Sequence, residues 1–297
     1  MIVDTIALTK GLKVEFNKAF QAAPPPKYGS LVLKTTSKSD SETYGWMGAP
    51  PAMREWVGER HVASMNDYSY EIANKNFEST VAVDRNEIED DQVGMIKPRI
   101  QEIAVRAKAY PDVLISDLVK ASLTGLAYDG AALCSNRTAP NDNLLAGTGV
   151  TEATLLTDLA AARAAMMAFT DDQGEVMNVV GDVVICHPGE EIFFMKILKS
   201  TTAVGATGAG EFNFWRDQLK AVIVDARLSD DNDWYLCASG YALKPFILQT
   251  RKAPQFIGLD KGTDEQVFMR RKLLYGVDMR ANAGYGLFRY IIQTVNA

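Results

Sequence analysis

Residues 41–60, SETYGWMGAPPAMREWVGER, restrict the fold of this chain more than any other stretch. Trp46 and Trp56 flank a pair of prolines, and charged residues interrupt the segment throughout. Because the segment is short and broken by proline, it cannot bury both indole rings in a core of its own. Large aromatic rings and a forked guanidinium such as that of Arg54 are typical of surfaces that contact another protein. We therefore expect this segment to form an intersubunit contact.

The composition is that of a globular protein large enough for a sizeable core. The chain is 47% hydrophobic and 23% charged, and no apolar run approaches the ~20 residues that span a bilayer. Its net charge of -6 does not favour nucleic-acid binding overall, so a surface that follows phosphates would need a local basic patch. The widely spaced Cys134, Cys186 and Cys237 argue against disulfides and a zinc site, which fits a reducing compartment.

The N-terminal region predicts a helix followed by extended chain. Apolar residues recur at helical steps through residues 5–21, and the prolines at 24–26 end the pattern because proline lacks the amide donor. Residues 27–41 are rich in Ser and Thr and suit an extended arm. We expect this region to contribute little to an isolated core, and either to fray or to lie on a neighbour.

Residues 44–83 predict a β-rich segment. Residues 60–65 and 68–73, joined by a turn at Asn66-Asp67, predict a hairpin, and residues 77–83 predict a further strand. A two-stranded hairpin alone is marginal in water, so we expect it to be mobile unless something packs on it. Its aromatic content again implies a partner surface.

The longest regular pattern follows an acidic helix start. Asp84 and Glu87 form a capping pair ahead of a further acidic run. Apolar residues then recur at helical steps from Ile96 onward, which predicts a long helix over residues 93–126. Pro111 must bend or restart this helix.

The second half of the chain divides into an α/β part and a final set of strands. Helices and strands alternate from residue 151 to 240, as in a compact α/β subdomain. The strands predicted beyond it cover residues 245–249, 255–257, 267–277 and 287–295. The basic triplet at 270–272 lies inside one of these strands. It is either a solvated edge that discourages stray pairing, or an intersubunit salt-bridge strip that faces the acidic residues 87–91.

Groups that could carry catalysis are sparse. The histidines are His61 and His187, and Cys186 and His187, as neighbours on a strand, point to opposite faces and cannot form a nucleophile–base pair. The glycine-rich run at 205–210 lacks the Lys-Ser/Thr of a phosphate-binding loop. The acidic residues 87–91 match no calcium loop. We therefore predict no catalytic residue, no cofactor and no metal site, and we classify the chain as a non-enzyme.

Several stretches resemble the Mu-like phage and prophage major head subunit family. They are SETYGWMGAPPAMREWVGER at 41–60, YEIANKNFESTVAVDRNEIEDDQVG at 70–94, YPDVLISDL at 110–118, YDG at 128–130 and RANAGYGLFR at 280–289. The resemblance is specific through residues 41–130 and vague over 131–260. The loop after YDG departs from the family pattern, which leaves the conformation of residues 131–147 open.

The resemblance implies an α+β fold of the Hong Kong 97 type, the fold of tailed-phage capsids. It assigns residues 1–40 to an N-terminal arm and 41–83 to an extended β-hairpin loop. Residues 84–150 are then a peripheral domain with a long spine helix, residues 151–243 an axial α/β domain, and residues 244–297 strands that return to the peripheral domain.

The function implied by the resemblance is that of a major capsid protein. Such a protein self-assembles through pentamers and hexamers into the icosahedral shell of a phage virion. The implied partners are further copies of the chain, a scaffolding protein, a protease and a portal, and the shell encloses double-stranded DNA without sequence-specific binding. We expect assembly in the bacterial host cytoplasm and no membrane contact.

Two alternatives stay open on the residues alone. An encapsulin-like nanocompartment has the same fold and encloses enzymes instead of DNA. A small-molecule-binding α/β enzyme would use residues 151–240 and would be a monomer or a small oligomer. For a shell subunit, the candidate intersubunit contacts are Trp46, Arg54, Trp56, Arg60, Glu87, Asp90, Asp91, Arg270 and Arg271.

Overall fold

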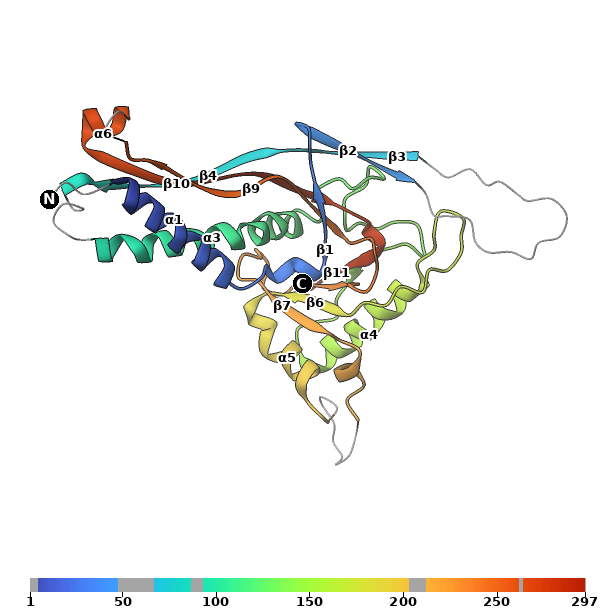
Figure 1. Cartoon of the computed structure of the whole chain (residues 1–297). Helices are drawn as coiled ribbons and strands as arrows, with labels where there is room; N and C mark the ends of the chain where they lie inside the picture. Colours follow the sequence, from blue (N-terminus) through green and yellow to red (C-terminus); the bar gives the residue numbers. More distant parts are fainter. Residues whose placement is uncertain (1–4, 48–66, 87–92, 203–211, 262–263, 297) are drawn as a thin grey trace.

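The computed structural model describes residues 5–47, 67–86, 93–202, 212–261 and 264–296 (Figure 1). Its helices are α1 (Thr5–Ala22), α3 (Val93–Lys120), α4 (Glu152–Ala168), α5 (Glu191–Lys199) and α6 (Glu265–Arg270). Its strands are β1 (Val32–Thr36), β2 (Ser41–Met47), β3 (Asp67–Ala73), β4 (Lys75–Asp84), β5 (Leu144–Ala146), β6 (Val183–Cys186), β7 (Ala221–Val224), β8 (Trp234–Cys237), β9 (Phe246–Leu259), β10 (Lys272–Tyr285) and β11 (Ile291–Val295). Short 3-10 helices are η1 (Lys27–Ser30), η2 (Pro188–Glu190), η3 (Phe214–Asp217) and η4 (Phe288–Tyr290).

A long sheet with the strand order β1-β9-β10-β4 forms the first lobe. β10 pairs antiparallel with both β9 and β4, while β1 pairs parallel with the first part of β9. Along β10, odd-numbered residues from Leu273 to Ala281 are buried and the even-numbered ones between them are not. This two-residue period is what a sheet with one covered face requires, and α1 and α3 lie on that face (Figure 1).

Helix α1 packs against its own chain. It covers the predicted residues and ends before the prolines, as the sequence pattern indicates. Leu12 and Phe16 are 1% and 2% exposed and belong to the same buried cluster as Ile100 and Tyr275. The expectation that this region adds little to an isolated core is therefore wrong for the helix, because its apolar face is covered within the subunit.

Helix α3 is a single element of 28 residues that connects the two lobes. It does not restart at Pro111, contrary to one of the predicted possibilities, and it ends at Lys120, before the predicted end at Leu126. Ile103 packs in the cluster under the first sheet, whereas Ile115 packs in the central core. The helix therefore fixes the position of one lobe relative to the other.

A second sheet, in the order β5-β11-β8-β6-β7, carries α4 and α5 on one face. Val184 and Cys186 of β6 pack toward these helices, while Val183 and Ile185 pack in the central core on the opposite face. Thr151 caps α4 in a capping box with Thr154. The predicted α/β alternation between residues 151 and 240 is confirmed.

The final strands differ from the prediction in two respects. Residues 245–249 and 255–257 belong to one continuous strand, β9. The predicted strand at 267–277 begins as helix α6, which ends at Arg271 in a left-handed conformation (φ 52°) before β10 starts. β11 pairs with β8 and β5 in the second sheet. Pairing there buries Ile291 completely.

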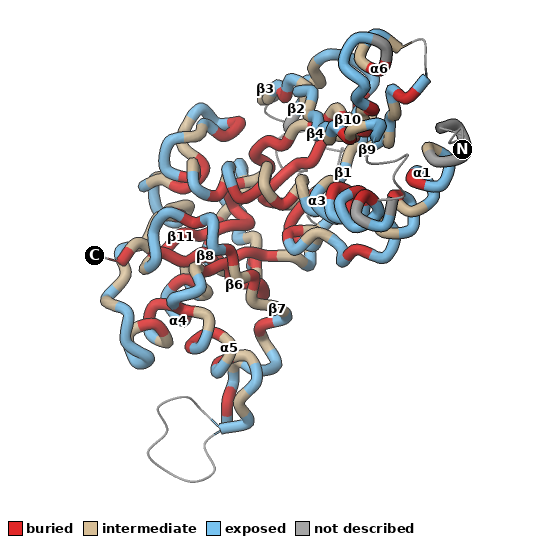
Figure 2. The backbone as a smooth tube through the Cα atoms, turned by 90° about the vertical axis from the view of Figure 1, so that its left-hand side faces the viewer, coloured by how far each residue is buried: buried red, intermediate tan, exposed pale blue. Residues whose placement is uncertain are grey.

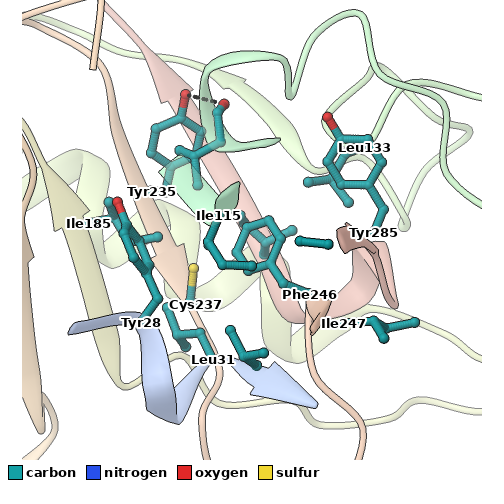
Figure 3. Close-up of a cluster of buried hydrophobic side chains, with 14 of the residues drawn as sticks. Tyr28, Leu31, Ile115, Leu133, Ile185, Tyr235, Cys237, Phe246, Ile247 and Tyr285 are labelled. Atoms are coloured by element: carbon teal, nitrogen blue, oxygen red, sulfur yellow. Dashed lines mark hydrogen bonds between the residues drawn. The ribbon is translucent and has the colours of Figure 1, made fainter. Parts of the chain in front are cut away.

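The central core lies between the lobes and draws on both. Figure 2 shows buried residues concentrated in the middle of the molecule, away from the tips. Tyr28 and Leu31 from the N-terminal region meet Ile115 of α3, Ile185 of β6 and Phe246 of β9 there (Figure 3). The segment after α1 is thus part of the core that holds the lobes together.

Candidate assembly surfaces

The β2–β3 hairpin is attached to its own subunit by tyrosines. The Tyr44 hydroxyl donates to Gln249 Oε1 at 2.9 Å and lies 2.7 Å from Thr35 Oγ1. The Tyr70 hydroxyl accepts from the Tyr285 amide at 3.2 Å. Both rings pack against the central core. The expectation that the aromatic content of the hairpin implies a partner surface is therefore wrong for these tyrosines, which are satisfied within the chain.

β3 pairs with β2, whereas the sequence pattern predicted pairing with residues 60–65. β3 pairs antiparallel with β2, and Tyr44 stands opposite Tyr70 in the register. Residues 60–65 and the Asn66 turn position, which were predicted to complete the hairpin, lie outside the described residues. Because directly opposed residues share a face, the register places these two tyrosines on the side that meets the core.

A buried amide connects the hairpin to the first sheet. Gln249 is fully buried on β9, and its Nε2 donates to the Ile72 carbonyl at 3.2 Å and to Asn74 Oδ1 at 2.9 Å. Sequence reasoning missed this residue. The available signal was a single amide inside the apolar run of a buried strand, where a polar side chain needs partners.

Charged contacts hold the start of the hairpin. Asp40 accepts from Arg251 at 2.8 Å and from Arg280 at 2.9 Å, and these hydrogen bonds and charges hold the pKa of its carboxyl below the usual value. Hydrogen bonds from the Lys38 amide and nearby serines lower the pKa of Glu42 to about 2. The hairpin therefore leaves the body of the subunit from a fixed base.

The predicted contact residues fall mostly beyond this base. Trp46 lies on β2 opposite Tyr68, and only its backbone is described. The remaining predicted residues of the loop and of the acidic run lie outside the described residues; they are Arg54, Trp56, Arg60, Glu87, Asp90 and Asp91. Arg270 and Arg271 are exposed at the end of α6 instead of inside a strand, because the helix ends at Arg271.

An exposed aromatic surface lies on the second lobe. Phe212 and Phe214 are 69% and 50% exposed. Between them, the buried Asn213 donates through Nδ2 to the carbonyls of Ile197 and Ser200 at 2.7 and 2.9 Å, which ties the segment to the end of α5. Exposed rings on a rigid support are what a protein interface uses, and sequence reasoning did not identify them.

The uncovered face of the first sheet carries an apolar trough. Ile257 and Leu259 are 46% and 47% exposed, and with Leu274 they line a hollow of about 230 Å³ beside Gly276. Gly276 lies on β10, the strand between β9 and β4 in this sheet. A second groove, of about 240 Å³, lies between α3 and β4 along the edge of the sheet.

Cys186 and His187 have structural roles, and His61 lies outside the described residues. Burial raises the pKa of the Cys186 thiol to about 12, so it is a poor nucleophile at neutral pH. His187 Nδ1 accepts from the Gly189 amide at 3.3 Å and so caps η2. In the part of the chain that the structure describes, no three metal-ligating side chains gather at one point. None of the described helices is long and apolar enough to cross a membrane.

Solved structures of the same architecture are capsid proteins. The procapsid protein of bacteriophage JBD30 is 29% identical, with a TM-score of 0.57 over 98% of this chain and 76% of that chain. The JBD30 capsid protein is 20% identical with a TM-score of 0.54, and a virus-like particle protein from Pyrococcus furiosus is 11% identical with a TM-score of 0.58. These matches cover 92% and 96% of this chain, and 65% and 98% of the respective neighbours. The fold is that of the Hong Kong 97-like capsid proteins.

Sequence comparison gives the family. Residues 6–151 and 225–296 match the model of the Mu-like prophage major head subunit gpT, and the chain belongs to this family of major capsid proteins. The major capsid protein of Escherichia phage Mu is 28% identical over 98% of this chain and 74% of its own length. The Mu-like prophage FluMu major head subunit of Haemophilus influenzae is 28% identical over 95% of this chain and 71% of its own length.

Proposed function

We propose that the chain self-assembles through pentamers and hexamers into an icosahedral shell that encloses double-stranded phage DNA. The observation that supports this best is the family match, which covers both the α1–α3 region and the strands of the first sheet. The encapsulin-like alternative is not favoured, because the family match and the curated relatives are phage and prophage head proteins. The purified particle decides between the two, because a phage head contains DNA whereas a nanocompartment contains enzyme cargo.

Each part of the subunit has a proposed place in that shell. Residues 41–83 are the extended loop that reaches a neighbour, and α3 with the first sheet is the peripheral domain. The α4–α5 lobe is the axial domain, and its exposed Phe212 and Phe214 are candidates for contacts around the symmetry axes. Residues 1–40 are an arm whose helix packs within its own subunit.

The proposed anchors of the extended loop are its tryptophans and arginines. Trp46, Trp56, Arg54 and Arg60 combine large rings with forked donors, the residue types that dominate interface energies. The acidic residues 87–91 and the exposed Arg270 and Arg271 form a second proposed contact through opposite charges. Both proposals concern contacts between copies, because a closed shell presents the same surfaces repeatedly.

The experiment is the replacement of Trp56 with alanine. Truncation of such an anchor removes ~2 kcal/mol or more per contact, so we expect a folded subunit that assembles poorly. Size-exclusion chromatography and negative-stain microscopy measure shell yield, and circular dichroism measures folding. Trp56→Phe, which keeps a large ring, is the matched control. Normal shells from Trp56→Ala at normal yield contradict the anchor proposal.

The proposed partners beyond further copies are a scaffolding protein, a protease and a portal, with assembly in the bacterial host cytoplasm. A shell of defined size requires something that fixes curvature, and a genome-filled shell requires an entry point. Expression of the chain alone tests this: we expect aberrant or open particles, which become uniform when the neighbouring phage proteins are co-expressed. Uniform closed shells from the chain alone contradict the need for a scaffold.

A further inference from the structure

The helical layer of the first lobe has the opposite charge to the chain as a whole. The chain has a net charge of -6. In contrast, α1 and residues 93–110 of α3 carry far more cationic than acidic side chains: Lys10, Lys13, Lys18, Lys97, Arg99, Arg106 and Lys108 against Glu15 and Glu102. This layer is therefore the local basic patch that an acidic protein needs if it is to contact phosphates.

The two helices run parallel and side by side. Gln101 Nε2 donates to Glu15 Oε2 at 3.1 Å, and Lys108 Nζ donates to the carbonyl oxygen of Gln21 at 3.1 Å. A residue of α1 therefore lies beside the residue of α3 whose number is about 86 higher. The same offset places Lys13 at the level of Arg99. Both helices lie on the same face of the sheet (Figure 1) and turn their apolar sides toward it. Most of their charged residues are exposed on the opposite side.

Most of these cations have no acidic partner. Arg106 pairs with Glu102 at 2.5 Å, and Lys108 is engaged with the last carbonyls of α1. The other five are exposed and form no ion pair or hydrogen bond through their side chains within the described ranges; they are Lys10, Lys13, Lys18, Lys97 and Arg99. Like charges on one layer repel each other, so an external polyanion that neutralises them is attracted to this face.

The composition of the exposed face favours nucleic acid over protein as that polyanion. From Thr9 onward, the exposed positions of α1 are Lys, Asn and Gln together with Gly11, Val14 and Ala22, and Val105 is the exposed large apolar residue on the adjacent part of α3. Protein interfaces are depleted in lysine and rich in aromatic residues, whereas contact with a phosphate backbone needs only exposed cations. Lys10 and Lys18 are about 12 Å apart along the helix axis, a length over which duplex DNA presents roughly seven phosphates.

We propose that the outer face of α1 and α3 binds the backbone of double-stranded DNA without regard to sequence. This inference rests on the proposed DNA-filled shell and specifies which side of the subunit contacts the genome. Binding depends on counterion release from the DNA, so it weakens steeply as salt rises. Each unpaired cation that contacts a phosphate adds its own contribution to that salt dependence.

The test is fluorescence anisotropy of a labelled 30-base-pair duplex, titrated with the full-length subunit between 25 and 200 mM NaCl. The variant combines Lys10→Gln, Lys13→Gln and Lys18→Gln. If each lysine contacts one phosphate, the slope of log affinity against log salt falls by about 2.7, and affinity at 100 mM salt falls on the order of 100-fold. The control combines Lys38→Gln, Lys75→Gln and Lys199→Gln, exposed lysines elsewhere with the same total charge change, and is expected to bind like the wild type.

Three results overturn the proposal: absence of duplex binding by the wild type, an equal loss in the control, or an unchanged salt slope in the α1 variant. Displacement of the duplex by polyglutamate at equal charge concentration also overturns it, in favour of an acidic protein partner. Circular dichroism checks the fold of each variant. Shell formation is scored separately by negative-stain microscopy, so a wild type that binds duplex but forms no shells counts against the proposed function alone.

Discussion

The buried carboxyl group of Glu190 predicts an unusual pH dependence of folding stability. Glu190 ends η2 and is 6% exposed, and neither of its carboxylate oxygens has a hydrogen-bond partner. Burial, together with the negative charges of Asp233, Asp231 and Asp230, raises its pKa to about 8. The folded protein therefore keeps this group protonated at neutral pH, whereas the unfolded chain ionises it near pH 4.5.

The sign and size of the effect follow from this difference. Between about pH 4.5 and 8 the native state binds the extra proton, so stability falls as pH rises through that window. At about 1.4 kcal/mol per pKa unit, the rise from 4.5 to about 8 corresponds to a loss of roughly 5 kcal/mol, as an upper bound. Glu190→Gln keeps a neutral group of the same shape at every pH. We therefore expect this variant to be more stable than the wild type at pH 9 and equal to it near pH 5, apart from the effect of the added amide.

The assay is urea unfolding of dilute subunits at pH values from 5 to 9, followed by circular dichroism. Glu191→Gln, at the next position and only half-buried, is the control and is expected to retain the slope of the wild type. Burial also raises the pKa of Asp233, which leaves a smaller slope of the same sign in every variant. If the stability curves of the wild type and Glu190→Gln run parallel across the whole range, the reasoning about the buried proton is wrong.

Three further substitutions test other contacts. Tyr28→Phe removes the hydroxyl that donates to buried Asp225 at 2.8 Å, and urea unfolding should show a loss of about 1–3 kcal/mol; a neutral effect contradicts the role of this bond. Gly284→Ala places a methyl group 2.5 Å from the Ile72 side chain, so thermal unfolding should show a destabilisation of about 1–3 kcal/mol, and an unchanged midpoint argues against tight packing there. Arg271→Gly relieves a left-handed conformation and should stabilise by roughly 1 kcal/mol in the same assay; normal shell yield from this variant removes Arg271 from the proposed contact strip.

Local patterns were sufficient to predict most helices and several strands. The apolar steps that place Leu12 and Phe16 on one face define α1, and the same reasoning finds α3 and α4. The cap of α4 is a local feature of the same kind, because the Thr151 hydroxyl before an apolar run satisfies a free helix amide. These features depend on residues within one or two turns of each other, so no knowledge of the fold is needed.

Pairings between distant segments could not be predicted in the same way. β3 pairs with β2 across residues 48–66, and β11 joins β8 and β5 instead of its neighbour β10. Alternation tells which residues of a strand share a face, but not which strand lies beside it. The role of Gln249 was hidden for the same reason, since its partners Ile72 and Asn74 are more than 170 residues away.

The same limit, that contacts between distant segments cannot be predicted from local sequence, explains which side chains were wrongly taken as partner contacts and which exposed ones were missed. The tyrosines of the hairpin were taken as partner contacts because a short segment cannot bury them locally, yet a distant core does so. Phe212 and Phe214 were not identified, because exposure of an aromatic residue depends on the loop that carries it and not on its neighbours in sequence. The sequence therefore identifies which apolar side chains are to be buried. Only the fold shows whether they are buried within the subunit or left exposed for another copy.

The two faces of the first sheet differ in a way that bears on assembly. One face is covered by α1 and α3, which present unpaired cations, and the other has the apolar trough of Ile257 and Leu259 at its surface. In a closed shell built from one chain, every copy must turn the same side inward. If the cationic side meets DNA, the apolar trough lies on the opposite side of the wall, where packaged phosphates cannot reach it. An exposed apolar surface of that kind is suited to protein contacts instead. Because side chains alternate between the two faces of a strand, the residues at every second position determine the chemistry of each face.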